Sequence, residues 1–302
     1  MIIETEGLTK YYGRVRGVEA LDLAVREGEV FGYLGPNGAG KTTTIRLLLD
    51  LIRPTRGTAR LFGQEVRGHA AALKTRIGNL PGELSLWDNL TGRELLTFTS
   101  GLRGGVDWRW VEELAGRLEL DLSRRVRSLS HGNKQKVGLI QAFAYKPALV
   151  ILDEPTLGLD PLIQQEFYAL VDQVKAEGRT VFVSSHVLPE VERVCDRVGI
   201  IREGQLVAVE QVTELKRKRL RQVELTFGSP VLASEFDLPG VRDVVQGDGT
   251  LRFLVEEVPG VFDSVIKRAA LYPVVDVKVA QATLEDVFLA YYRKESDDAA
   301  AA

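Results

Sequence analysis

The stretch that decides the fold spans residues 35–43 and reads Gly35-Pro36-Asn37-Gly38-Ala39-Gly40-Lys41-Thr42-Thr43. An apolar run, Val30–Leu34, precedes it, and a leucine-rich segment follows at residues 41–52. This pattern predicts a strand, a glycine loop and the start of a helix. Glycines let a backbone bend until successive N–H groups point at one anion, and the first helical turn adds unpaired donors and a positive dipole end. The stretch therefore predicts a phosphate-binding loop.

Two side chains of this loop indicate what kind of phosphate it binds. Lys41 supplies a mobile positive charge for the outer phosphates of a nucleotide. Thr42 places a hydroxyl where a magnesium ion bridging those phosphates would need an oxygen ligand. We therefore expect a nucleotide site with Mg²⁺.

Composition is that of an ordinary globular chain. Its 302 residues predict about two domains. The net charge of −3 gives no broad electrostatic reason to expect nucleic-acid binding. Cys195 is the single cysteine, on a segment with one apolar helical face, so we expect a buried thiol in a reducing cytoplasm. No apolar run reaches the roughly 18 residues of a membrane span, and no signal peptide is expected.

The N-terminal region alternates in the manner of strands. Strands are expected at residues 2–6, 21–26, 58–62 and 76–80. Tyr12 follows the first of them and precedes a glycine. Its ring could stack on a purine or close the edge of the sheet, and local sequence favours neither.

Residues 84–146 change to a helical pattern and predict an all-helical insertion. Thr91 and Glu94 form a capping box ahead of an apolar run, and a second apolar stripe lies at residues 110–118. The three tryptophans lie at its start, where packing is favoured over partner contact: Trp87, Trp108 and Trp110. The segment 128–135 closes the insertion and, taken alone, is a polar helix cap.

Two further strands end in polar residues. Leu149–Leu152 is fully apolar and delivers Asp153 and Glu154 at its carboxyl end, where open α/β sheets hold ligands. On an extended chain these side chains point opposite ways, so one can hold magnesium through water while the other acts as general base. The strand at residues 180–183 delivers His186, which is placed to meet a γ-phosphate. Between these strands, Asp160 is expected to cap the helix Pro161–Ala176.

The order of these motifs resembles the nucleotide-binding subunit of an ABC transporter over roughly residues 1–215. The matching features are the phosphate loop, a Leu-Ser-x-Gly motif at Ser130 and Gly132, the Asp-Glu strand, a Gly-Leu-Asp turn and a strand-end His. The resemblance implies an α/β fold: a P-loop NTPase (RecA-like) core with an antiparallel β subdomain and a helical insertion at about residues 84–146. Residues 37–39 and 284–289 look like the bacterial ABC-2 exporter branch, as in multidrug and antibiotic export.

The resemblance also implies a role for each matching residue. Tyr12 would stack on adenine, and Gly35, Pro36, Asn37, Gly38, Ala39, Gly40, Lys41, Thr42 and Thr43 would bind the phosphates of ATP. Asp153 would join Thr42 at the Mg²⁺ ion, Glu154 would be the catalytic base and His186 the γ-phosphate sensor. Ser130 and Gly132 would bind ATP across a head-to-tail homodimer that forms on ATP binding, with Asp160 linking the two sites.

Two departures from the family pattern concern coupling and turnover more than ATP binding. Gly82 followed by Glu83 stands where the family has glutamine, and we hypothesise that Glu83 recovers part of that contact. His131 and Asn133 alter the family's Leu-Ser-Gly-Gly-Gln signature.

Beyond Glu214 the pattern predicts a second, small α+β domain at residues 222–293, with a regulatory or interaction role, and a disordered tail at 294–302. The function that follows is an ATP-hydrolysing subunit of an exporter, working through a separate membrane-spanning permease at the inner face of the cell membrane. The alternative is a soluble ABC-type ATPase outside transport. The single phosphate loop and the lack of sustained heptads disfavour it.

Overall fold

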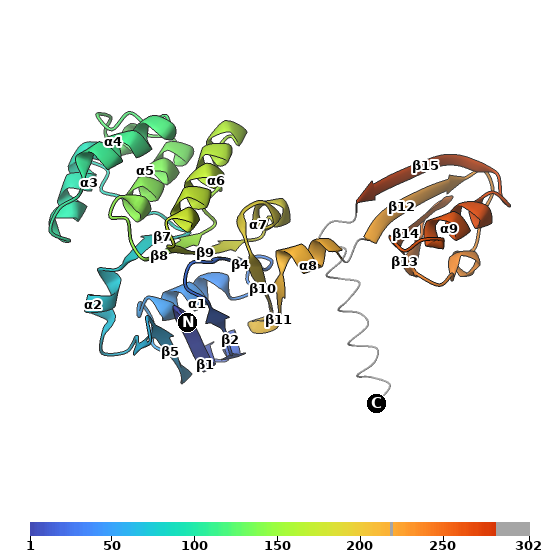
Figure 1. Ribbon diagram of the computed structural model, residues 1–302, viewed down its shortest axis with the longest axis horizontal. Coiled ribbons are helices and arrows are strands. Elements are labelled where there is room, and N and C mark those ends of the chain that lie inside the picture. Colours follow the sequence, from blue (N-terminus) through green and yellow to red (C-terminus); the bar gives the residue numbers. More distant parts are fainter. Residues whose placement is uncertain (218–219, 282–302) are drawn as a thin grey trace. The chain divides into compact units, whose positions relative to one another are not determined.

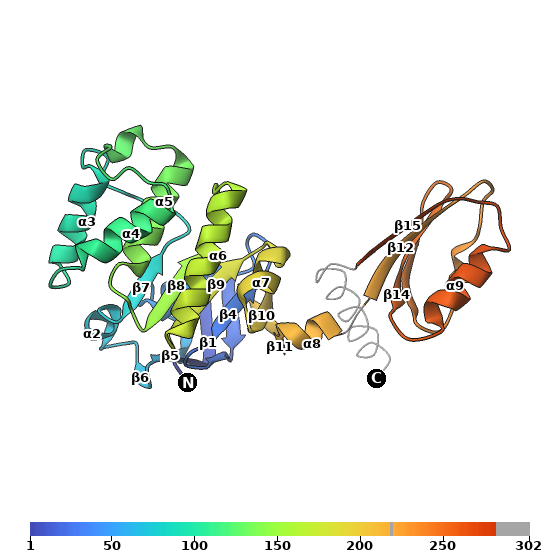
Figure 2. The same cartoon turned by 45° about the horizontal axis from the view of Figure 1, so that its top comes forward.

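The computed structural model describes residues 1–217 and 220–281 (Figures 1 and 2). Side chains are described except at residues 215–220 and 281. The chain divides into two compact units, Met1–Glu210 and Gln211–Ala302. No helix within the described ranges is long and apolar enough to cross a membrane.

A six-stranded sheet forms the centre of the first unit. Its strand order is β11-β10-β4-β9-β8-β7, and every neighbouring pair from β10 to β7 is parallel. The bounds are Val30–Leu34 (β4), Ile77–Leu80 (β7), Leu149–Asp153 (β8), Thr180–Ser185 (β9), Arg197–Arg202 (β10) and Gln205–Gln211 (β11). Strands β4, β8 and β9 are buried almost throughout because helices cover both faces of the sheet.

The two faces of this sheet take alternate residues of each strand. Phe31, Tyr33 and Phe182 pack toward α1 (Lys41–Leu48) in one large apolar cluster. On the other face lie α6 (Pro161–Ala176) and α7 (Leu188–Val194), which pack on β9. Cys195 follows α7 and is buried against Gly32, where an added Cβ would lie 2.9 Å from its sulfur. The thiol is therefore part of the core, as its sequence context suggests.

An antiparallel sheet packs on the other side of α1. Its order is β2-β1-β5-β6, with β3 beside β1, and its bounds are Ile3–Tyr12 (β1), Val15–Leu21 (β2), Ala24–Val25 (β3), Arg56–Leu61 (β5) and Gln64–Glu65 (β6). The first strand, expected to end at residue 6, continues to Tyr12. Gly7 takes a positive φ of 54°, and the register with β2 shifts beyond Leu8, so the strand bends without ending.

The helical insertion contains α3 (Gly92–Gly101), α4 (Trp108–Arg117), a short 3₁₀ turn η1 (Val126–Ser128) and α5 (His131–Phe143). Figure 1 shows α3, α4 and α5 grouped beyond β7 and β8. The capping box at Thr91 and Glu94 forms as expected. Trp110 is buried and donates to the carbonyl of Phe143 at 3.1 Å, whereas Trp87 is 55 % exposed. A short helix α2 (Ala70–Lys74) precedes β7 and was not anticipated from the sequence.

The second unit begins with α8 (Val212–Arg217) and contains a four-stranded antiparallel sheet of order β13-β14-β12-β15. The bounds are Leu220–Phe227 (β12), Val241–Gln246 (β13), Thr250–Glu256 (β14) and Val274–Gln281 (β15). Helix α9 (Val261–Ala269) and the 3₁₀ turn η2 (Ala233–Phe236) cover one face, where the core is entirely apolar. The expected helix at residues 283–293 and the tail at 294–302 lie outside the described residues.

Candidate functional site

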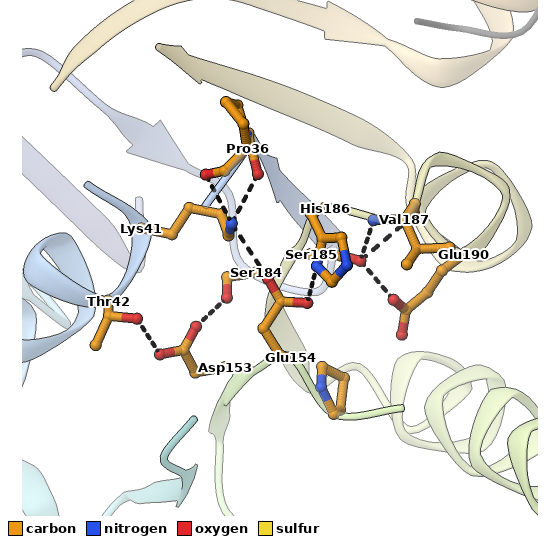
Figure 3. A network of polar contacts seen from close by, with 12 residues as sticks. Pro36, Lys41, Thr42, Asp153, Glu154, Ser184, Ser185, His186, Val187 and Glu190 are labelled. Carbon is orange, nitrogen blue, oxygen red and sulfur yellow. Dashed lines mark hydrogen bonds and ion pairs between the residues drawn. The ribbon is translucent and has the colours of Figure 1, made fainter. Parts of the chain in front are cut away.

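The site is assembled at the carboxyl edge of the central sheet, where β4, β8 and β9 end side by side (Figure 3). The glycine loop leaves β4 and enters α1 at Lys41. A Cβ on Gly35 would lie 2.4 Å from the carbonyl oxygen of Ile201, and one on Gly40 would lie 2.5 Å from that of Gly17. Gly40 also takes a φ of 109°, so both positions require glycine.

The start of α1 suits an anion. Its first turn carries no acidic residue, and no side chain caps its N-terminus. The amide donors and the positive dipole end of this helix therefore meet no carboxylate from the helix itself. This is the arrangement that the glycine loop predicts.

Lys41 is buried and bends back over its own loop. Its Nζ donates to the carbonyl oxygens of Gly35 at 2.7 Å and Pro36 at 3.2 Å. The same nitrogen lies 3.1 Å from Oε1 of Glu154. The ammonium group is thus held between the loop and the first residue after β8, where an outer phosphate could replace its contacts.

Asp153 is almost fully buried and holds two hydroxyls. Thr42 Oγ1 donates to its Oδ2 at 2.7 Å, and Ser184 Oγ donates to its Oδ1. No group of three or more His, Cys, Asp or Glu side chains that could form a metal centre occurs among the residues described. One carboxylate and one hydroxyl fit Mg²⁺, which usually keeps waters and phosphate oxygens as its remaining ligands.

Glu154 occupies a left-handed backbone conformation, with φ of 51°. The expectation that Asp153 and Glu154 diverge along an extended chain is therefore wrong, because β8 ends at Asp153 and the chain turns at once. The turn still separates the two carboxylates. Glu154 Oε2 lies 2.8 Å from Nδ1 of His186, away from the hydroxyls that hold Asp153.

Gln135 supports this turn and was not recognised from the sequence. Its Nε2, on α5, donates to the carbonyl oxygens of Glu154 at 3.1 Å and Pro155 at 3.2 Å. The only signal in the sequence was an amide little more than one helical turn after the cap at Ser130. An amide there ties the helical insertion to the backbone that presents Glu154.

Ser130, Gly132 and Asp160 lie at the starts of two helices, α5 and α6. Ser130 caps α5 and accepts from the amide of Asn133 at 3.3 Å. Gly132 abuts Gly158 so closely that an added Cβ would lie 2.4 Å from the carbonyl oxygen. Asp160 caps α6 through the amides of Leu162 and Ile163, as predicted. Within the described chain, no hydrogen bond or ion pair joins these three residues to Lys41, Asp153 or Glu154.

Tyr12 lies at the end of β1 with its side chain 44 % exposed. Gly17 lies between the Tyr12 side chain and Thr43 of α1. A Cβ added at Gly17 would lie 3.0 Å from Tyr12 and 3.1 Å from Thr43. The residue is partly exposed next to the phosphate loop, with Lys10 Nζ 5.2 Å from the centroid of its ring, and stacking on a purine stays a prediction.

Gly82, at the end of β7, lies against the carboxylate of Asp153. A Cβ there would approach Oδ2 to 2.9 Å and Cγ to 3.2 Å. The neighbouring Glu83 is exposed. The position where the family pattern has glutamine is therefore filled by a residue whose small size leaves room for Asp153.

The fold and this cluster together define a P-loop nucleotide-binding protein. The family model described as ABC transporter matches residues 18–157. The chain is 37 % identical over 259 residues to the bacitracin transport ATP-binding protein BcrA of Enterococcus faecalis, covering 83 % of each chain. It is 35 % identical over 219 residues to the linearmycin resistance ATP-binding protein LnrL of Bacillus subtilis, covering 71 % of this chain and 70 % of that one.

Solved structures agree. An ATP-binding subunit of an ABC transporter superposes with a TM-score of 0.66 at 30 % identity, covering 72 % of this chain and 92 % of that chain. A dimeric bacterial ABC transporter cassette, at 22 % identity and a TM-score of 0.65, shares the fold. The chain belongs to the family of ABC transporter ATP-binding proteins, and as a member of it binds ATP and is an ATPase. The fold class and the family resemblance inferred from the sequence are thus confirmed.

Proposed function

We propose that this chain is the ATP-hydrolysing subunit of an exporter for antibiotic-like molecules, acting with a separate membrane-spanning permease. The observation that carries the chemistry is the contact of Glu154 with both Lys41 and His186, beside Asp153 and Thr42. The named relatives that act in bacitracin transport and linearmycin resistance support the choice of cargo class.

In this proposal each side chain has one task. The loop amides and Lys41 bind the phosphates, and Tyr12 stacks on adenine. Thr42 and Asp153 would hold Mg²⁺, which neutralises phosphate charge when bound. Glu154 leaves Lys41 when the phosphate takes the ammonium group, and it then orients and deprotonates the attacking water. His186 contacts the γ-phosphate and holds Oε2 of Glu154.

Ser130 and Gly132 serve a second copy of the chain. Ser130 is exposed at the start of α5 and makes no contact with its own phosphate loop in the described chain. A head-to-tail homodimer would bring it to the γ-phosphate of the partner, and Asp160 would link the two sites. The dimeric cassette of the same fold supports this arrangement.

The test is Glu154→Gln, which keeps the shape of the side chain and removes the base. General-base help contributes about 10²–10⁴ in rate, so hydrolysis should fall by that factor while ATP binding persists. With magnesium-ATP the variant should elute as a stable dimer by light scattering, whereas the wild type returns to monomer as ATP is consumed. Glu113→Gln, an exposed charge change on α4, is the control. Hydrolysis by Glu154→Gln at the wild-type rate would exclude Glu154 as the base.

A candidate contact surface for the permease lies beside β7. Two adjoining cavities of about 180 and 250 Å³ share Asn79 and Arg103 in their linings. Asn79 Oδ1 is buried there without a hydrogen-bond partner among the described residues. The positive charges of Arg103 and Lys74 would suit an acidic segment of the permease. Arg103→Glu should reduce co-purification with the permease and leave ATP binding intact, whereas unchanged co-purification would remove this surface from the proposal.

The alternative, an ABC-type ATPase outside transport, makes a different prediction. An exporter subunit should be found at the inner face of the membrane only in cells that hold its permease. Fractionation of cells with and without the permease distinguishes the two, because a non-transport ATPase would show the same distribution in both.

The second unit would regulate the ATPase or contact a partner, since its described part contains no cluster of catalytic type. Deleting residues 215–302 should leave a folded cassette that binds ATP but dimerises or couples differently. A deletion variant that fails to fold would show that the two units do not form separate domains.

A further inference from the structure

Glu190 is a buried carboxylate that the proposed mechanism does not use. It lies in the first turn of α7 and is 1 % exposed. Its buried Oε1 makes no hydrogen bond of normal geometry within the described chain, although the hydroxyl of Thr156 is near enough to act on the pKa of the carboxyl. A buried carboxylate with an unpaired oxygen is costly, and that cost calls for an explanation beyond helix capping, for which an exposed acid suffices.

A chain of hydrogen bonds leads from Glu190 through Ser185 to the backbone of Val187, the residue that follows His186 (Figure 3). Ser185 Oγ lies 2.6 Å from Glu190 Oε2, and the amide of Val187 donates to the same Oγ at 2.9 Å. Ser185 has a single hydroxyl hydrogen. It goes to Glu190 rather than to the carbonyl of Val187, which is 3.4 Å away. Because the carboxylate accepts this hydrogen, a lone pair of Ser185 Oγ is free to accept from the amide of Val187. The two hydrogen bonds of Oγ therefore hold the short turn that carries His186.

The same carboxyl lies close to the loop that carries Glu154. Burial raises the pKa of Glu190 to about 7, the hydroxyls of Ser185 and Thr156 oppose this rise, and the charges of Glu154 and His186 also act on it. Thr156 is two residues beyond Glu154. Glu190 therefore faces both turns that hold the Glu154–His186 pair.

We propose that Glu190 is a positioning residue for ATP hydrolysis: through Ser185 it fixes the turn of His186, and so holds the ring nitrogen of His186 at Glu154. His186 itself is 41 % exposed at its side chain, so packing alone does not fix its ring. The contact of 2.8 Å to Glu154 then depends on the backbone position that the Ser185 hydroxyl maintains. This inference rests on the roles proposed for Glu154 and His186.

The experiment compares steady-state hydrolysis and nucleotide binding in Glu190→Ala, Ser185→Ala and the double variant. Misplacing a catalytic group by about 1 Å can cost about 10²-fold, so kcat should fall about 10- to 100-fold in each. The affinity for a fluorescent ATP analogue should stay within about twofold, because the phosphate loop is untouched. Since both residues act through one chain of hydrogen bonds, the double variant should lose no more than the single ones.

Two further variants separate positioning from simple destabilisation. Glu190→Gln keeps the volume and an acceptor oxygen, and should recover part of the rate lost in Glu190→Ala. Glu192→Gln makes the same charge change on the same helix and should retain wild-type kcat. Three results would each overturn the inference. They are a wild-type kcat in Glu190→Ala, losses that add up in the double variant, and a loss of kcat in Glu192→Gln as large as that in Glu190→Ala.

Failure of the underlying function would look different. His186→Ala and Glu154→Gln, measured in the same assay, should both lose hydrolysis. If they retain it, the roles assigned to that pair are wrong, and the inference falls with them. If they lose it while Glu190→Ala does not, only the inference is wrong.

Discussion

Two sheets of this protein hold their charged residues in opposite ways. At the edge of the central parallel sheet, Lys41, Asp153 and Glu190 are all buried; hydroxyls bind the two carboxylates, and two carbonyls and Glu154 contact the lysine. On the C-terminal sheet, Glu224 of β12 pairs across the strands with Arg252 of β14 and Lys278 of β15, on the face opposite the apolar core.

The difference distinguishes charged residues that serve a chemical site from charged residues that form ion pairs on the surface. Burying a charge costs free energy unless it is paired, whereas exposed ion pairs cost and contribute little. A sequence that concentrates buried charges at one sheet edge does so for a function. The C-terminal sheet contains no such concentration in its described part, which fits a role in contact or regulation.

The largest effect should come from removing the buried cation. Lys41→Ala takes away the ammonium that lies between the glycine loop and Glu154, and leaves that carboxylate facing other acceptors. We expect ATP affinity to fall about 100-fold or more, because the variant has no ammonium group to pair with the phosphates of ATP. Removing one partner of a buried charge pair is strongly unfavourable. Calorimetry should measure ATP affinity in Lys41→Ala and in Lys267→Ala. Lys267→Ala is the control, because Lys267 forms an ion pair with Asp263 on the surface. If Lys41→Ala bound ATP within twofold of the wild-type affinity, the buried charge at the central sheet would have no greater effect than the exposed one.

The second effect is a dependence of stability on pH that Glu190 should cause. Its pKa is about 7 in the folded protein, against an ordinary value of 4.5. The groups that face it are Glu154 and His186 from the site, and Tyr168 and Cys195, whose pKa values are raised first by burial and then by the charge of Glu190. Because the folded state binds this proton more tightly, stability falls as pH rises from 4.5 to 7. The loss amounts to about 3 kcal/mol.

Glu190→Gln should remove that loss. Denaturant unfolding of the variant should therefore gain stability relative to the wild type as pH rises through this window, and change no further above pH 7. A constant difference between the two proteins from pH 4.5 to 7 would show that Glu190 keeps an ordinary pKa in the folded state.

The sequence predicted the parallel sheet and the phosphate loop because apolar runs and glycine spacing are local signals. It missed the full length of β1, since the strand continues past the bend at Gly7 by pairing with β5, which lies far along the chain. It also missed α2, which is only five residues long. Non-local pairing and short helices leave too little periodicity to be recognised.

The site was predictable in its members and not in its geometry. Lys41, Thr42, Asp153, Glu154 and His186 were each selected from their place at a strand or helix end, and the structure brings them together. The extended backbone expected at Glu154 was wrong, because a positive φ outside glycine has little sequence signal. Gln135 and Glu190 were not recognised from the sequence, because an amide or an acid on a helix is indistinguishable from a solvated surface residue until its burial is known.

The third effect concerns Gly82, and it tests how tightly the buried edge is packed. Gly82→Ala places a Cβ 2.9 Å from Asp153 Oδ2, and that carboxylate is fixed by Thr42 and Ser184. We expect hydrolysis to slow about tenfold through displacement of Asp153. Glu83→Ala, at the exposed neighbour, is the matched variant in the same kinetic assay. A larger loss in Glu83→Ala would support the hypothesis that Glu83 recovers part of the contact of the missing glutamine.

The smallest effect should come from the exposed pair on the C-terminal sheet, and its sign should be opposite to that of Glu190. Hydrogen bonds from Lys278 and Arg252 lower the pKa of Glu224 below its ordinary value. A carboxylate with a lowered pKa contributes stability above its unfolded pKa, and that contribution is lost as pH falls through the folded value. Glu224→Gln should therefore lower the melting temperature slightly at neutral pH and not at all in acid, while kcat and ATP affinity stay unchanged. Scanning calorimetry across pH, with hydrolysis measured alongside, checks both statements. A loss of hydrolysis in Glu224→Gln would mean that the C-terminal sheet acts on the catalytic edge, and that its surface charges have more than a structural role.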